Sequence, residues 1–151
     1  MSYVKDLDTA ETTGLEQIQF FAADGLKYRG IGHKLGFHIA EVEKGRVVFE
    51  ATPNEDAYNP LGTVHGGYLA TLLDSALGCA IHSSLKPRLL YTTLELKVNY
   101  LRAMTAATGP IRAEGRALQT GRRAAFAEGE IKDDKGNVYA TATTTCLVFD
   151  K

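Results

Sequence analysis

One long apolar segment, from about His65 to about Ser84, sets the main constraint on the fold. Small and aliphatic side chains recur along it every three or four residues: Leu69, Leu73, Ala76 and Ala80, flanked by Leu72 and Leu77. This spacing predicts a helix with one apolar face that must be buried against another element. Pro87 follows shortly after the segment and prevents the helix from continuing.

Strand-like segments account for most of the remaining sequence. FHIAEVEKGRVVFEAT predicts a hairpin around Lys44 and Gly45, and TLELKVNYL alternates strictly between apolar and polar residues. The apolar members should share one face of a half-buried strand: Leu94, Leu96, Val98 and Tyr100. PIRAEGRALQTG, RRAAFAEGEIKD and NVYATATTTCLVF complete an antiparallel meander, with turns at Thr120 and Gly121 and in DDKGN.

The balance of these elements predicts the architecture. Five or six strands share one long helix, which is too little to cover both faces of a flat sheet. The predicted fold class is therefore α+β, with a curved antiparallel sheet wrapped around one long central helix. The outer face of the sheet is expected either to meet a second subunit or to face water.

The chain length of 151 residues fits one main domain. Residues 1–33 are weakly patterned and are interpreted as an N-terminal extension, with residues 34–151 forming the domain. Within the extension, GLEQIQFFAADG is expected to form a short amphipathic helix ended by Gly25.

The charge pattern excludes several classes of partner. Seventeen basic residues balance 18 acidic ones, and the basic residues are scattered apart from Arg122 and Arg123, so no nucleic-acid partner is expected. Neither a signal peptide nor a bilayer-spanning run is found, so no membrane partner is expected. Cys79 and Cys146 fit small buried residues in a reducing compartment, and the predicted location is cytoplasmic.

Asp74 is an acidic residue in the middle of the most apolar segment. On a helical wheel it lies on a flank with small or apolar neighbours, and no Lys or Arg stands three or four residues away to pair with it. Such a carboxylate is either solvated by a cleft or retained for a chemical purpose.

The start of the same helix offers hydrogen-bond donors. The first turn of a helix has backbone N–H groups without partners, and Gly66 and Gly67 lack the Cβ that would keep another group away. Such donors can stabilise an oxyanion, while Asp74 activates water or attacks directly. Eight residues of helix separate Gly66 from Asp74 by about 12 Å, so two antiparallel helices across a two-fold axis are needed to unite them.

Each of these residues also has a purely structural interpretation. His65 could be a helix-entry residue, the glycines could permit close packing, and Asp74 could lie on a solvent-facing flank. The residues alone leave the two interpretations about equally weighted.

The stretch NPLGTVHGGYLATLLD, from Asn59 to Asp74, resembles the helix-entry motif of hotdog-fold acyl-CoA thioesterases, in the PaaI-like and 4-hydroxybenzoyl-CoA thioesterase group. The order of hairpin, helix and meander also matches over roughly residues 34–149. The resemblance implies a hotdog fold, hydrolysis of an acyl-CoA or aryl-CoA thioester, and assembly as a homodimer or homotetramer. It implies no metal and no cofactor, since coenzyme A is part of the substrate.

The resemblance also implies roles for individual residues. Asp74 would be the catalytic carboxylate, and Gly66 would supply the oxyanion-hole N–H from the partner subunit, next to Gly67. Asn59 and His65 would position the thioester carbonyl and the helix entry. Two further pairs complete the candidate site: Thr92 or Thr93 as the hydroxyl near the attacking water, and Arg122 with Arg123 for the phosphates of coenzyme A. An ordinary exposed turn explains the arginine pair almost as well.

Other constellations in the sequence are weaker. His33 and His38 have no spacing that suits a zinc site. Cys79 and His82 could form a thiolate dyad, but no third group to orient the histidine is evident. Two alternatives within the hotdog proteins stay open: an acyl-thioester dehydratase or hydratase, and a non-catalytic acyl-CoA-binding protein. Asp74 within the helix argues against the first, and its presence together with the His-Gly-Gly entry disfavours the second.

Overall fold

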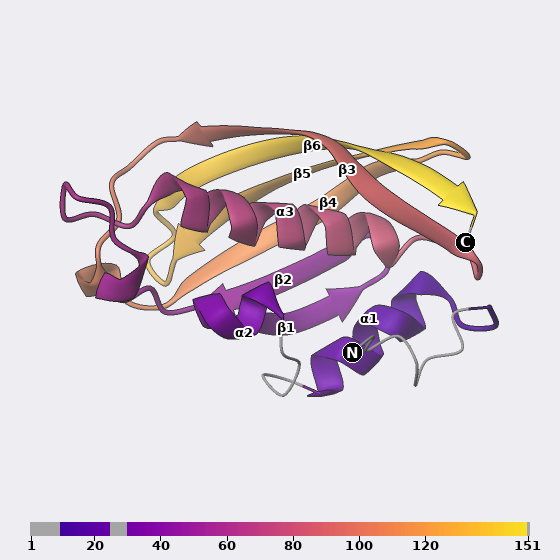
Figure 1. Ribbon diagram of the computed structural model, residues 1–151, viewed down its shortest axis with the longest axis horizontal. Helices are drawn as coiled ribbons and strands as arrows, with labels where there is room; N and C mark the ends of the chain where they lie inside the picture. The colour runs from indigo at the N-terminus through magenta and orange to yellow at the C-terminus, as the bar shows by residue number, and fades with distance from the viewer. Residues whose placement is uncertain (1–9, 25–29, 151) are drawn as a thin grey trace.

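A six-stranded antiparallel sheet curves around one long helix, α3 (Gly66–His82), in the computed structural model, which describes residues 10–24 and 30–150 (Figure 1). The strands lie in the order β1-β2-β4-β5-β6-β3. Their bounds are β1 (Phe37–Glu43), β2 (Arg46–Ala51), β3 (Leu89–Tyr100), β4 (Ile111–Thr120), β5 (Ala124–Asp133) and β6 (Val138–Asp150). The shorter helices are α1 (Gly14–Asp24), α2 (Ile31–Leu35), η3 (Glu55–Ala57) and η4 (Ala106–Thr108). The predicted fold class is confirmed.

The apolar stripe of α3 forms the centre of the core. All six side chains predicted to face the sheet are buried: Leu69, Leu72, Leu73, Ala76, Leu77 and Ala80. The helix ends at His82 with Ser83 as its C-cap, close to the predicted end.

Two paired glycines let α3 approach the sheet closely. Gly115 of β4 and Gly129 of β5 stand opposite each other in register. A Cβ at Gly115 would lie 2.3 Å from the carbonyl oxygen of Ala76, so the backbone of the helix rests almost directly on the strand. Any larger residue at this position would push the helix away from the sheet.

The predicted hairpins are also present. β1 and β2 pair around Lys44 and Gly45, and Gly45 has the positive φ of 79° that glycine adopts without strain. In the turn between β5 and β6, Asp133 Oδ1 accepts hydrogen bonds from the backbone N–H groups of Lys135 and Asn137. These turns fix the register of the meander.

One prediction for β3 is wrong. The pairing with β6 skips a residue between Thr93 and Glu95, so Leu94 is the extra residue of a β-bulge and is 62% exposed. Leu96 and Val98 pack against the core as expected, whereas Tyr100 is also largely exposed at the end of the strand. The alternation of the sequence cannot reveal an inserted residue, because a bulge reverses the phase of the strand.

Outward-facing charges cover the sheet around β1, β2 and β4. Arg46 lies 2.8 Å from Glu41 and 2.9 Å from Glu114, and Arg112 pairs with Glu41 and Glu50. The two arginines lower the pKa of Glu41 through hydrogen bonds. This part of the outer face is therefore suited to water.

The predicted N-terminal helix is confirmed as α1, although Gly25, expected to end it, lies outside the described residues. Gly14 donates its N–H to the carbonyl of Leu85, and the Gln17 side chain is hydrogen bonded to His82 across 2.9 Å. These contacts hold α1 against the end of α3. Helix α2 spans the predicted domain boundary between residues 33 and 34.

In the described part of the chain, every helix is too short or too polar to cross a bilayer.

Candidate active site

Asp74 lies half-buried in the middle of α3 and faces β3. The hydroxyl of Thr93 donates a 3.0 Å hydrogen bond to its Oδ1. No Lys or Arg among the described residues forms an ion pair with this carboxylate. Asp74 is thus oriented by a neutral donor, and its second oxygen is left for another partner.

Only one of the two candidate threonines contacts Asp74 within the described residues. Thr93 pairs with the buried Cys146 and faces α3, whereas Thr92 pairs with Leu147 on the opposite face and is exposed. Thr92 therefore does not contact Asp74, and Thr93 is the threonine that the structure brings to this carboxylate. The bulge at Leu94 is the cause, because it places Thr93 rather than Thr92 on the same face as Leu96.

At the start of α3, His65 acts as the N-cap. Its Nδ1 accepts a 2.8 Å hydrogen bond from the N–H of Gly67, which requires that this nitrogen carry no proton. The N–H of Gly66 has no acceptor within residues 10–24 and 30–150. Of the two glycines, Gly66 therefore has the donor still available to a ligand.

Two side chains fix the surroundings of Gly66. Tyr100 donates its hydroxyl to the carbonyl of Gly66 across 2.9 Å. Asn59 uses its side chain within the preceding loop, where Oδ1 accepts from the N–H of Leu61 and Nδ2 donates to Thr63. Asn59 thus shapes the loop that leads to the helix.

Arg122 and Arg123 are exposed in the turn between β4 and β5. This turn lies beyond the C-terminal end of α3, since Ala117 of β4 bonds to Gly45, which in turn bonds to Ser83 (Figure 1). Within one chain the arginines are therefore far from Gly66 at the other end of the helix. Gly66 and Asp74 are also separated by about 12 Å of helix.

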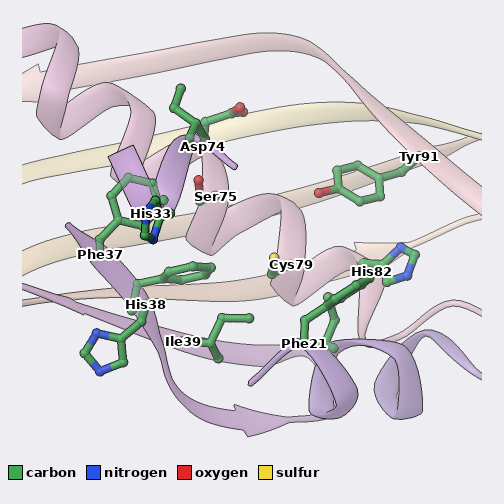
Figure 2. Close-up of a pocket in the computed structure, with 14 residues that line it drawn as sticks. Phe21, His33, Phe37, His38, Ile39, Asp74, Ser75, Cys79, His82 and Tyr91 are labelled. Atoms are coloured by element: carbon green, nitrogen blue, oxygen red, sulfur yellow. The ribbon is translucent and has the colours of Figure 1, made fainter. Parts of the chain in front are cut away.

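A cavity of about 370 Å³ opens beside Asp74 (Figure 2). Helix α3 contributes Asp74 and Cys79, and Tyr91 enters from β3. Aromatic and aliphatic side chains from α1, β1 and β2 form the opposite wall: Ile18, Phe21, Phe37, Ile39 and Phe49. The site therefore combines one carboxylate with a largely apolar chamber of the size that holds small organic groups.

The family described as the Thioesterase superfamily matches residues 61–140, more than half of the chain. The chain belongs to the thioesterase superfamily. The match includes α3 with Asp74 and the strands β3, β4 and β5. The predicted resemblance and the class of enzyme are thereby confirmed.

Individual relatives of this thioesterase agree with the family. The 1,4-dihydroxy-2-naphthoyl-CoA hydrolase of Listeria monocytogenes is 27% identical over 122 residues, covering 81% of this chain and 98% of that protein. A phenylacetic acid degradation-related protein from Ralstonia eutropha JMP134 is 27% identical with a TM-score of 0.75, covering 90% and 99% of the two chains. A Streptococcus mutans protein bound to acetyl CoA is 26% identical with a TM-score of 0.72, covering 83% and 95%. The hotdog fold is confirmed.

Cys79 and His82 do not form a nucleophilic pair in this thioesterase. Burial raises the pKa of the Cys79 thiol to about 12, and the negative charge of Asp74 adds to the rise. Burial lowers the pKa of His82, whose Nε2 is hydrogen bonded to Gln17. A neutral thiol beside a neutral imidazole that is bonded elsewhere gives no thiolate.

No three His, Cys, Asp or Glu side chains of the described segments converge into a group able to hold a metal ion. His33 and His38 both line the cavity instead, at its α2 and β1 side.

Sequence reasoning missed much of the cavity wall. Tyr91, Ser75 and Phe21 line the cavity and were not singled out from the sequence. One signal was available in α1, where Ile18 and Phe21 stand three residues apart and so share a helix face. Nothing in the sequence alone shows that this face turns toward Asp74.

Proposed function

We propose that the protein hydrolyses an acyl-CoA or aryl-CoA thioester to the free acid and coenzyme A. The observation that carries the proposal is the hydrogen-bonded pair of Asp74 and Thr93 at the edge of an apolar cavity. The relatives support the substrate class, because one is a naphthoyl-CoA hydrolase and another holds acetyl CoA.

The proposed reaction needs only an activated water and a polarised carbonyl. The Asp74 carboxylate takes a proton from water as its oxygen attacks the thioester carbon, or attacks that carbon itself. The N–H of Gly66 donates to the oxygen that becomes negative. The C–S bond then breaks, and the sulfur leaves with the electron pair and takes up a proton as the thiol. If Asp74 itself attacks, this step leaves an anhydride between Asp74 and the acyl group, and water then hydrolyses the anhydride to release the acid. No metal or redox cofactor is required.

We propose that two copies of the chain share each site, with Gly66 of one subunit meeting Asp74 of the other. The edge strand β3 supports this assembly, because in the described chain it pairs only with β6 and its other edge is open. An antiparallel copy of β3 along this edge would extend the sheet.

Exposed apolar side chains on the outer face of the sheet support further assembly into a homotetramer: Leu118, Phe126 and Phe149. The free thiols of Cys79 and Cys146 fit the reducing cytoplasm as the site of action.

The direct test is thiol release from a panel of acyl-CoA and aryl-CoA esters by the wild type and by Asp74→Asn. The variant keeps the size of the side chain and its hydrogen bond with Thr93, and removes the base. We expect kcat to fall on the order of 100-fold or more. Equal hydrolysis by the variant would reject Asp74, and tight binding without hydrolysis by the wild type would indicate a binding protein.

A further inference from the structure

The hydroxyl of Tyr91 lies against α3 because residue 78 is a glycine. A Cβ at Gly78 would come within 2.5 Å of the Tyr91 oxygen and within 3.0 Å of its ring carbon Cζ. Figure 2 shows Tyr91 extending from β3 with its hydroxyl directed toward the helix. Gly78 and Tyr91 therefore form a matched pair that positions a phenol in the cavity wall.

This hydroxyl has no hydrogen-bond partner within residues 10–24 and 30–150. Burial raises the pKa of Tyr91 well above its ordinary value, with smaller contributions from Cys79 and Asp74, so the phenol stays protonated. Because Tyr91 lines the cavity, a ligand there that carries an acceptor can form the hydrogen bond that the described residues do not supply.

Neighbouring donors on the same side of the cavity already have acceptors. Ser75 donates its hydroxyl to the carbonyl of Thr71, and Thr93 donates to Asp74. The opposite wall consists largely of aromatic rings, among them Phe21, Phe37 and Phe49. A flat apolar group with one polar substituent fits these surroundings.

The Tyr91 and Gly78 pair lies about one helical turn from Asp74 along α3. Gly78 follows Asp74 by four residues, which is about 6 Å along the helix. Tyr91 precedes Thr93 by two residues on the same face of β3, which is about 7 Å along the strand. An aromatic ring attached to the thioester carbonyl spans a comparable length.

We propose, on the basis of the proposed function, that Tyr91 determines acyl specificity by forming a hydrogen bond with a hydroxyl group on an aromatic acyl group. The carbonyl of that acyl group lies beside Asp74, and its ring lies among the phenylalanines. Tyr91 takes no part in bond breaking and acts on substrate choice.

The test compares Tyr91→Phe with the wild type on two aryl-CoA esters that differ only by a ring hydroxyl. The ratio of kcat/KM for the hydroxylated ester to kcat/KM for the plain ester should fall about tenfold in the variant. The loss on the plain ester should be clearly smaller than the loss on the hydroxylated ester. Tyr139→Phe is the matched control, because its hydroxyl bonds to Asp133 outside the cavity, and it should keep the wild-type ratio.

Binding of the same two esters to Asp74→Asn, with and without Tyr91→Phe, separates this proposal from hydrolysis. We expect the hydroxylated ester to bind more tightly only when Tyr91 is present. Equal losses on both esters, no wild-type preference, or binding of neither ester would overturn the role of Tyr91. Failure of the wild type to hydrolyse either ester, with the binding preference intact, would overturn the proposed reaction alone.

Discussion

Thr93 donates a 3.0 Å hydrogen bond from β3 to the Asp74 carboxylate in the middle of α3. Thr93→Val keeps the shape of the side chain and removes this bond, so the carboxylate loses its orientation. We expect kcat to fall about tenfold with KM little changed, which steady-state kinetics would measure. Thr93→Ser should restore most of the loss. Thr92→Val, on the opposite face, should behave like the wild type, and an equal loss there would contradict the assignment.

The backbone N–H of Gly66 can be removed selectively by substitution with proline. Gly66→Pro deletes the N–H at the first position of α3, where proline is tolerated, and His65 already has the extended backbone that precedes proline. We expect kcat to fall on the order of 100-fold or more. Gly66→Ala retains the N–H and places the same Cβ near Tyr100, so it isolates the steric effect. Equal kcat values for the two variants would exclude the donor.

Mixing subunits that carry Asp74→Asn with subunits that carry Gly66→Pro tests whether two chains share each site. Subunits carrying Asp74→Asn and subunits carrying Gly66→Pro are each expected to be nearly inactive as homodimers. If each site takes Asp74 from one subunit and Gly66 from the other, a mixed dimer has one intact site. Its activity should then recover to about half of the wild-type value. Sites built within single chains would give no recovery.

The lowered pKa of His82 predicts how the free energy of unfolding depends on pH. Because burial lowers its pKa in the folded chain, the unfolded chain binds its proton first as the pH falls through about 6.5. The free energy of unfolding should therefore decrease from about pH 7.5 to about pH 5.5, as followed by urea titration. His82→Gln removes the titrating group and keeps an amide near Gln17, so its dependence should be flatter. An unchanged slope would assign the effect to other groups.

Gly115 should be the most sensitive position of β4. A Cβ there would meet the carbonyl oxygen of Ala76 at 2.3 Å, and this contact is with backbone that cannot rotate away. Gly115→Ala should lower the free energy of unfolding by about 1–3 kcal/mol, as measured by denaturant unfolding. The exposed Gln119 of the same strand provides the control, because Gln119→Ala should change stability by less than about 0.5 kcal/mol.

The sequence predicted the elements well because their periods are regular. The stripe from Leu69 to Ala80 repeats like a helix and is buried, and the glycine turns appear where the strands must reverse. The bulge at Leu94 was not predictable in this way, and it explains why the sequence could not choose between Thr92 and Thr93. Strict alternation places Thr92 on the face of Leu96, whereas one extra residue places Thr93 there.

The cavity was harder to predict than the carboxylate. Asp74 is conspicuous because a charge interrupts an apolar helix, but Tyr91 is an ordinary strand residue in the sequence. Its importance depends on Gly78, which comes 13 positions earlier and lies on another element. Contacts of this kind are set by how a strand crosses a helix, and no local pattern reports that geometry.

Helix α1 has a further consequence for how this chain can diversify. It supplies Ile18 and Phe21 to the cavity wall, yet it lies outside the sheet and is tied to α3 near Gly14 and Gln17. Substitutions on its inner face can reshape the chamber while Asp74, Thr93 and Gly66 keep their positions. Under the proposed function, substitutions in α1 can therefore change which acyl groups the cavity accepts while the proposed catalytic residues on α3 and β3 stay in place.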